Sequence, residues 1–133
     1  MVGKDIKEYN SKQTKEERSI CDLLAKEIDI NFRATESKVW HAHPVWFVNG
    51  NPTVGYSRQK RGIRLMFWSG DDFNEDKLEP GKGKFKDASI FYNSTNEVNT
   101  HDLRRWLKKA EKIQWDYKNI VKRKGKLIKI KLL

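Results

Sequence analysis

Two close histidines, His41 and His43, are the first residues of this sequence whose types and spacing could do chemistry. In an extended segment, side chains at positions i and i+2 point to the same side, so the two imidazoles could share a metal ion. In a helix they would diverge. No neighbouring carboxylate in the sequence completes a three-ligand site. The alternative is that both imidazoles line a polar pocket near Pro44 and Trp46 or simply form hydrogen bonds with the neighbouring backbone, and these interpretations stay open.

The densest group of carboxylates lies between Asp71 and Glu79. Clustered carboxylate oxygens suit Ca²⁺, Mg²⁺ or iron. The stretch does not fit the calcium-binding loop, because Lys77 stands where that loop requires glycine and Gly83 stands where it requires a bidentate glutamate. We therefore expect a solvated surface loop here.

Other chemical motifs are incomplete. The run from Gly81 to Lys84 (Gly-Lys-Gly-Lys) resembles a phosphate cradle, but its glycine spacing is too short for a P-loop and Phe85 follows the lysine instead of serine or threonine. A turn before a strand explains both glycines.

Cys21, the only cysteine, falls within a predicted amphipathic helix, where a small buried thiol is usual. Because no Gly-x-Ser-x-Gly motif occurs either, the sequence gives no indication of an enzyme.

The net charge of +10 is concentrated at the C-terminal end of the chain. Residues 101–133 carry 12 basic and 3 acidic side chains, a net of +9, and no carboxylate occurs after Lys118. A local excess of this kind attracts polyanions such as nucleic acids, although a solvated helix face with a basic tail would have the same composition.

Trp115 lies within this basic region. On a helical wheel it falls far from the apolar stripe and in line with Lys108 and Lys122, so it could stack on a nucleobase. Alternatively, the apolar residues of 127–133 could return and cover it. The predicted polyanion-binding residues are Arg104, Lys108, Lys112, Trp115, Lys118, Lys122, Arg123 and Lys124.

Length and composition limit the protein that positions these residues. A chain of 133 residues usually forms one domain, and 37% hydrophobic residues, including 5 Trp, are sufficient for a core. Apolar runs reach only four residues, whereas a membrane-spanning helix needs about 20. The N-terminus lacks an apolar secretory segment. We therefore expect a cytoplasmic single domain over residues 1–133 with no membrane partner.

The pattern predicts two helices near the N-terminus. Residues 1–13 are polar and without periodicity, so we expect a flexible arm. Thr14 and Glu17 fit a capping box, and apolar residues at helical spacing follow until about residues 29–32. A second short helix is predicted from Glu36 to His41, ended by Pro44.

The spacing of the apolar residues changes in the middle of the chain and again towards its end. Short runs at 45–48, 53–58, 63–68 and 85–92 predict strands, with a turn at 49–52, and tight connections make the first three antiparallel. A helical turn is predicted near 73–78. A long helix is predicted from residue 100 to Gly125, with a stripe formed by Leu103, Trp106, Leu107, Ala110, Ile113, Tyr117, Ile120 and Val121. Residues 127–133 alternate, which favours an edge strand over a free tail.

Several motifs in this order resemble the YdhG-like family of small bacterial proteins. They are Trp40-His41-x-x-Pro44-Val45-Trp46, Leu65-x-Phe67-x-x-Gly70 and Leu78-x-x-Gly81-x-Gly83-Lys84 with Ile90. Many members are known only as a domain of unknown function, and some are described as frataxin-like iron chaperones. The resemblance implies an α+β fold, with an antiparallel sheet of four or five strands and N-terminal and C-terminal helices packed on one face.

The resemblance also implies a non-enzymatic protein that binds a small ligand or a metal ion, with iron as the cofactor that the family suggests. The cleft for it would be formed by His41, His43, Trp46, Asp71 and Asp72. The alternative is a polyanion or nucleic-acid binding module that uses the basic C-terminal helix. A third hypothesis is that residues 127–133 pair with the sheet of a partner protein.

Overall fold

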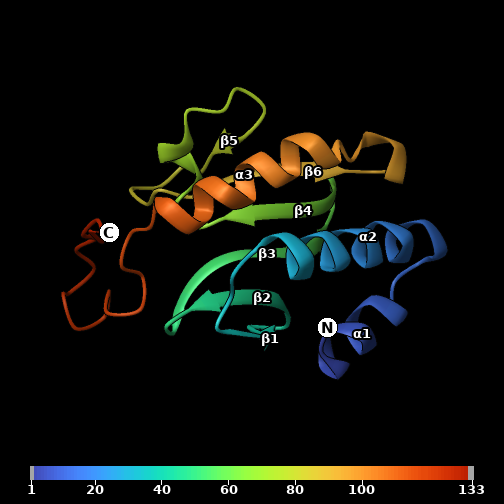
Figure 1. The fold of residues 1–133 in the computed structure, drawn as a ribbon, viewed down its shortest axis with the longest axis horizontal. Coiled ribbons are helices and arrows are strands. Elements are labelled where there is room, and N and C mark those ends of the chain that lie inside the picture. Colours follow the sequence, from blue (N-terminus) through green and yellow to red (C-terminus); the bar gives the residue numbers. More distant parts are fainter. Residues whose placement is uncertain (1, 132–133) are drawn as a thin grey trace.

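The computed structural model describes residues 2–131, which form helices and one antiparallel sheet (Figure 1). In chain order, the elements are α1 (Lys4–Ser11), α2 (Lys15–Asn31), β1 (Glu36–Trp40), β2 (His43–Val48), β3 (Asn51–Gln59), β4 (Gly62–Phe67), the 3-10 turn η1 (Gly70–Phe73), β5 (Glu79–Pro80), β6 (Ala88–Tyr92), the 3-10 turn η2 (Thr95–Glu97) and α3 (Thr100–Lys112). Within residues 2–131, no helix has the length and apolar character needed to cross a membrane.

The strand order in the sheet is β1-β2-β3-β4-β6-β5, and every neighbouring pair is antiparallel. This confirms the predicted α+β class and the predicted strands β2, β3 and β4, while the sheet has six strands instead of four or five. The turn between β2 and β3 contains Asn49 and Gly50 at φ of 51° and 82°. Both residues are in the left-handed region, as a tight hairpin requires, so the predicted turn at 49–52 is confirmed.

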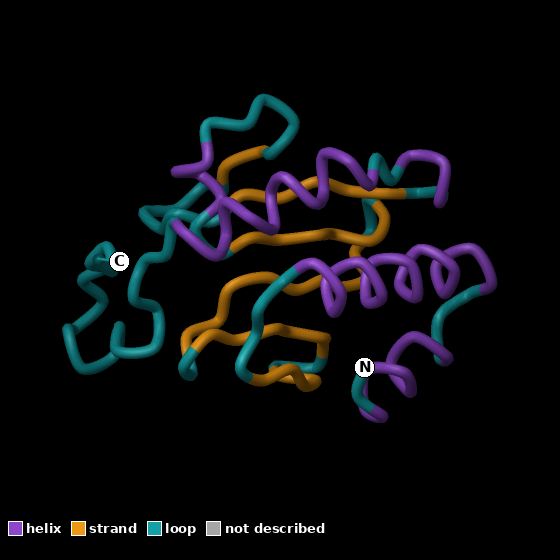
Figure 2. The backbone as a smooth tube through the Cα atoms, in the orientation of Figure 1, coloured by secondary structure: helices purple, strands orange, loops and turns teal. Residues whose placement is uncertain are grey.

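Helices α2 and α3 lie side by side across one face of the sheet (Figure 2). The capping box of Thr14 and Glu17 is formed at the start of α2. On α3, Leu103, Trp106 and Leu107 are buried against the sheet, as the helical stripe predicted. The buried residues of the helices and of this sheet face form one core, which includes Ile20, Cys21, Leu24, Ile28, Tyr56, Ile63, Leu65, Phe67, Tyr92, Leu103, Trp106, Leu107 and Ala110.

The prediction of a flexible arm at residues 1–13 was wrong, because α1 occupies most of it and packs beside α2 and β1 (Figure 1). Ile6 is fully buried, and the buried Asn10 accepts a hydrogen bond from the Tyr56 hydroxyl at 2.6 Å. A helix of eight residues with a single buried apolar side chain gives no periodic signal, so its order depends on these tertiary contacts.

The predicted helix from Glu36 to His41 is instead strand β1 and the turn that follows it. β1 pairs with β2, and His41 and Ala42 form the two-residue turn at φ of 50° and 70°. Neither residue is glycine, so the sequence lacked the usual hairpin signal. Pairing with β2 satisfies the backbone of this segment, which overrides the local capping pattern.

The predicted long C-terminal helix was also wrong in its second half. α3 ends at Lys112, Ile113 has extended backbone angles, and residues 114–131 form turns and irregular segments. The Asn51 side chain accepts hydrogen bonds from the backbone N–H groups of Tyr117 and Lys118. In a continuing helix, these N–H groups would instead donate to the backbone carbonyls four residues earlier. The predicted strand at 127–133 is reduced to an isolated bridge between Trp115 and Lys129, and residues 132–133 lie outside the described part of the chain.

Candidate nucleic-acid interface

The residues of the predicted ligand cleft are not brought together. His41 is exposed in the β1–β2 turn, and His43 stacks on Trp68 with ring centroids 6.4 Å apart. Trp46 is buried on the helix-covered face, where its indole N–H donates to Asp29 at 3.5 Å. Side chains three positions apart on a strand point to opposite faces, so His43 and Trp46 cannot line one pocket.

The two carboxylates of that cleft lie elsewhere. Asp71 is exposed in η1, and Asp72 forms an ion pair with Lys129 at 2.7 Å. Asp72 also accepts a hydrogen bond from the Trp115 indole N–H at 3.2 Å. Within residues 2–131, no three His, Cys, Asp or Glu side chains are grouped so that they could hold a metal ion. The iron role therefore rests on the family resemblance alone.

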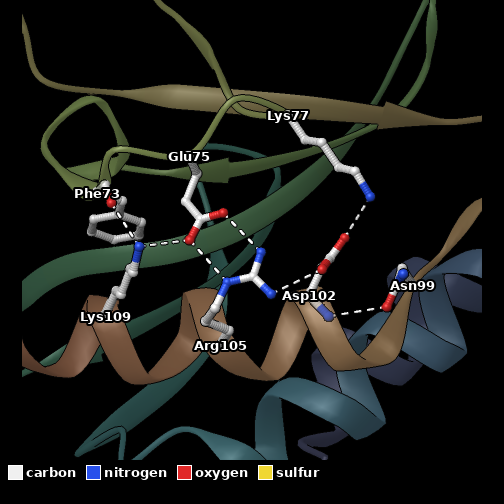
Figure 3. Close-up of polar contacts among 7 residues, drawn as sticks. All are labelled: Phe73, Glu75, Lys77, Asn99, Asp102, Arg105 and Lys109. Atoms are coloured by element: carbon white, nitrogen blue, oxygen red, sulfur yellow. Dashed lines mark hydrogen bonds and ion pairs between the residues drawn. The ribbon is translucent and has the colours of Figure 1, made fainter.

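The acidic stretch from Asp71 to Glu79 is largely exposed, as its composition predicted, but Glu75 and Lys77 tie it to α3 (Figure 3). Glu75 accepts hydrogen bonds from the Arg105 guanidinium at 2.8 and 3.0 Å and from the Lys109 ammonium at 2.6 Å, and only 10% of its side chain is exposed. Asp102 pairs with Lys77 at 2.6 Å and with Arg105 at 2.9 Å. Arg105, followed by Lys109, holds the pKa of Glu75 well below its usual value. These groups attach the loop to α3 and are already occupied.

Most of the predicted polyanion-binding cations are also occupied or scattered. Arg104 pairs with the buried Glu27 at 2.8 Å, Arg123 pairs with Asp116 at 2.6 Å, and the Lys118 ammonium donates to the Asn49 carbonyl at 3.1 Å. Lys108, Lys112 and Lys122 are exposed. Two of the eight predicted residues, Trp115 and Lys124, line a common hollow.

That hollow is lined by four lysines, and we call it the lysine hollow. It has a volume of about 390 Å³ and is formed by two segments, one before β6 and one near the C-terminus: Lys84, Phe85, Lys86, Trp115, Lys124, Gly125, Lys126 and Leu127. Within residues 2–131, none of its four lysines forms an ion pair. Among the lining residues described there are four lysines and no carboxylate; Asp72, whose pKa is lowered by Lys129 and to a smaller extent by Lys86, lies nearby without lining the hollow. This excess of positive charge favours an anionic ligand.

Local contacts hold Lys86 and the backbone of the C-terminal segment beside the hollow. The Lys86 ammonium lies 4.9 Å from the centre of the Trp115 ring, and the Lys86 backbone N–H donates to the Tyr117 hydroxyl at 3.0 Å. Lys124 and Gly125 have φ of 54° and 86°, and the Gly125 N–H donates to the Ile120 carbonyl at 2.8 Å. This left-handed turn folds the C-terminal segment back towards residues 84–86.

Asp116 holds the first part of the same turn. Its carboxylate accepts hydrogen bonds from the Asn119 backbone at 3.1 Å and from Arg123 at 2.6 Å. Trp115 is half-buried between Lys86, Asp72 and the segment that contains Lys129. Of the two alternatives for Trp115, the C-terminal segment does return beside it, and the partly exposed residue forms a wall of the hollow.

Sequence reasoning missed Lys84, Lys86 and Lys126 as site residues. Lys84 ends the Gly-Lys-Gly-Lys run, which the P-loop template excludes, yet its ammonium reaches the space beside Gly125. The lysine content of that run was a usable signal. That run alone could not identify the site, because the second segment that forms the hollow lies about 40 residues further along the chain.

Comparisons of the chain with protein-family models, with curated proteins and with solved structures find no match. The resemblance to the YdhG-like family therefore stays a prediction from its motifs. The function has to be inferred from the residues and geometry of this chain itself.

Proposed function

We propose that this protein binds nucleic acid through the lysine hollow. The observation that carries the proposal is the convergence of Lys84, Lys86, Lys124 and Lys126, none of which forms an ion pair within residues 2–131. Lysine is a compact cation that binds phosphate groups as a point charge. Four of them around one space suit a ligand with several adjacent phosphates.

The aromatic side chains among these lysines favour nucleic acid over a simple polyphosphate. Phe85 is 41% exposed at the rim of the hollow, and its ring is tilted against Tyr117 with centroids 6.2 Å apart. An exposed aromatic ring beside cations is a feature of surfaces that follow a phosphate backbone while contacting bases. The basic C-terminal region that the sequence singled out thus contributes, although as a folded-back segment and not as a helix.

The experiment is a titration of a fluorescently labelled oligonucleotide followed by anisotropy at several salt concentrations. We expect the logarithm of the affinity to fall linearly with the logarithm of the salt concentration. The double variant Lys84→Glu/Lys124→Glu should weaken binding by about tenfold or more and reduce the salt slope by about one to two.

The matched control is Lys108→Glu/Lys112→Glu on α3. It makes the same change in net charge at two exposed lysines that do not line the hollow. We expect it to retain most of the affinity. Equal losses in both double variants would assign binding to net charge or to the face of α3, and no binding by the unmodified protein would overturn the proposed function.

A further inference from the structure

A second, apolar hollow lies next to the lysine hollow and shares Phe85 with it. It has a volume of about 320 Å³ and is lined by Met66, Trp68, Phe85, Asp87, Tyr117 and Ile120. We call it the aromatic hollow. We propose that it receives an unpaired nucleobase whose phosphates lie in the lysine hollow, so that the preferred ligand is single-stranded nucleic acid. This inference rests on the proposed function.

The aromatic hollow is built on the face of the sheet opposite α2 and α3. Leu65 and Phe67 are buried beneath the helices, so the alternating residues Met66 and Trp68 point to the other face. Gly55 on the neighbouring strand lies against β2, because a Cβ atom at Gly55 would lie 2.5 Å from the Pro44 carbonyl oxygen, and the Trp68 ring passes beside it at ordinary contact distance. Tyr117 and Ile120 approach from the C-terminal segment and close one side.

The rings of this hollow are held in place before any ligand binds. The Tyr117 hydroxyl donates to the Trp68 carbonyl and accepts from the Lys86 N–H, so both of its hydrogen-bonding roles are used. Burial raises the pKa of Tyr117 to about 12, which keeps the phenol neutral. Trp68 stacks on His43 at an interplanar angle of 27°. A preformed aromatic surface loses little freedom when a base stacks on it.

The placement of charge selects the orientation of the ligand. None of the four lysines of the lysine hollow lines the aromatic hollow. Among the described residues that line the aromatic hollow, the one charged side chain is that of Asp87. Asp87 lies 3.5 Å from Arg64. A phosphate group would therefore be attracted to the first hollow, whereas the second offers it no cation among its lining residues and suits an uncharged base. A nucleotide has the same division, with a charged phosphate and an uncharged base. Phe85, which lines both hollows, lies at the boundary between them.

The base has to be unpaired to enter. In a duplex the bases are stacked and paired inside the helix, and placing one in an outside pocket requires that it be flipped out. In a single strand the base is already accessible, and stacking on an aromatic surface contributes to affinity for any base.

Three labelled probes of equal length test this inference: a single strand, the duplex of the same sequence, and a single strand in which abasic sites replace the nucleosides. The abasic strand keeps its phosphates and lacks bases. We expect the unmodified protein to bind the intact single strand about tenfold more tightly than the abasic strand, and also more tightly than the duplex. Phe85→Ala should remove this preference.

Ile120→Ala provides a second variant. Ile120 lines the aromatic hollow but not the lysine hollow, so this substitution changes only the lining of the aromatic hollow. It should reduce the preference while leaving binding of the abasic strand unchanged. The matched control is Phe91→Ala, which removes a half-buried ring of β6 that lines neither of the two hollows and lies under Arg61. We expect it to keep the preference.

The outcomes separate the two proposals. Equal affinity for the intact and abasic strands, or an unchanged preference in both Phe85→Ala and Ile120→Ala, would overturn the base-binding hollow and leave phosphate binding standing. A tighter complex with the duplex would also overturn it. Failure of the unmodified protein to bind any of the three probes would overturn the proposed function itself.

Discussion

The hydroxyl group of Tyr117 donates a hydrogen bond to the backbone carbonyl of Trp68, which follows the last residue of β4. The same hydroxyl accepts a hydrogen bond from the backbone N–H of Lys86 at 3.0 Å. One side chain of the C-terminal segment thus connects the end of β4 to the loop before β6. Because Lys86 lines the lysine hollow and Trp68 lines the aromatic hollow, Tyr117 positions both.

Tyr117→Phe should reduce both stability and nucleic-acid binding. The variant keeps the ring but removes two hydrogen bonds, so we expect a loss of about 1 to 2 kcal/mol in the free energy of unfolding. Urea denaturation measures this loss, and anisotropy measures binding. Tyr9→Phe is the control, because the Tyr9 hydroxyl accepts a hydrogen bond from Arg58, a residue of β3 that lines neither hollow. It should reduce stability without changing the affinity, and equal affinities of both variants would contradict a positioning role of Tyr117.

Acid should destabilise the protein through the carboxylates that contact cations. Arg105 lowers the pKa of Glu75, Lys77 lowers that of Asp102, and Lys129 lowers that of Asp72. A carboxyl group with a lowered pKa binds fewer protons in the folded state than in the unfolded state. Its stabilising contribution is therefore complete above the unfolded pKa, about 4.5 for glutamate, and is lost as the pH falls below that value.

Glu75→Gln tests this pH dependence at one residue. The amide cannot accept charge-assisted hydrogen bonds from both Arg105 and Lys109, so we expect a loss of about 1 to 3 kcal/mol at pH 7 and a shallower decline of stability below pH 4.5. Glu8→Gln changes an exposed carboxylate of α1 and should stay within about 0.5 kcal/mol of the unmodified protein. Thermal or urea unfolding between pH 3 and 7 measures both, and identical profiles for the two variants would contradict the assigned role of Glu75.

Cys21 should be unreactive in the folded protein. Its side chain is fully buried on α2, and burial raises the pKa of the thiol to about 12, so almost no thiolate forms at pH 8. Iodoacetamide should label the native protein far more slowly than the protein in guanidinium chloride, as measured by mass spectrometry. Labelling at the same rate in both conditions would show that this part of α2 opens freely.

The elements whose signals are local could be predicted, and those that depend on distant partners could not. Thr14 and Glu17 lie three residues apart and cap α2 by themselves, and the Asn49-Gly50 turn needs no other segment. In contrast, α1 is ordered by contacts of Ile6 and Asn10 with α2 and β3, and β1 is a strand because β2 lies beside it. Helical spacing continued past Lys112, but the Asn51 side-chain oxygen accepts hydrogen bonds from the backbone N–H groups of Tyr117 and Lys118, which a helix would use internally.

The sequence by itself determined that the protein has an α+β fold, a helix-covered core and an excess of positive charge near its C-terminus, because these follow from composition and from spacings within a few residues. Only the tertiary structure decided which charges remain available. Arg104 and Arg123 are neutralised by Glu27 and Asp116, whereas Lys84 and Lys124 come together from segments 40 residues apart. A charge acts on what lies within a few ångströms of it, and that distance is set by the folding of the chain.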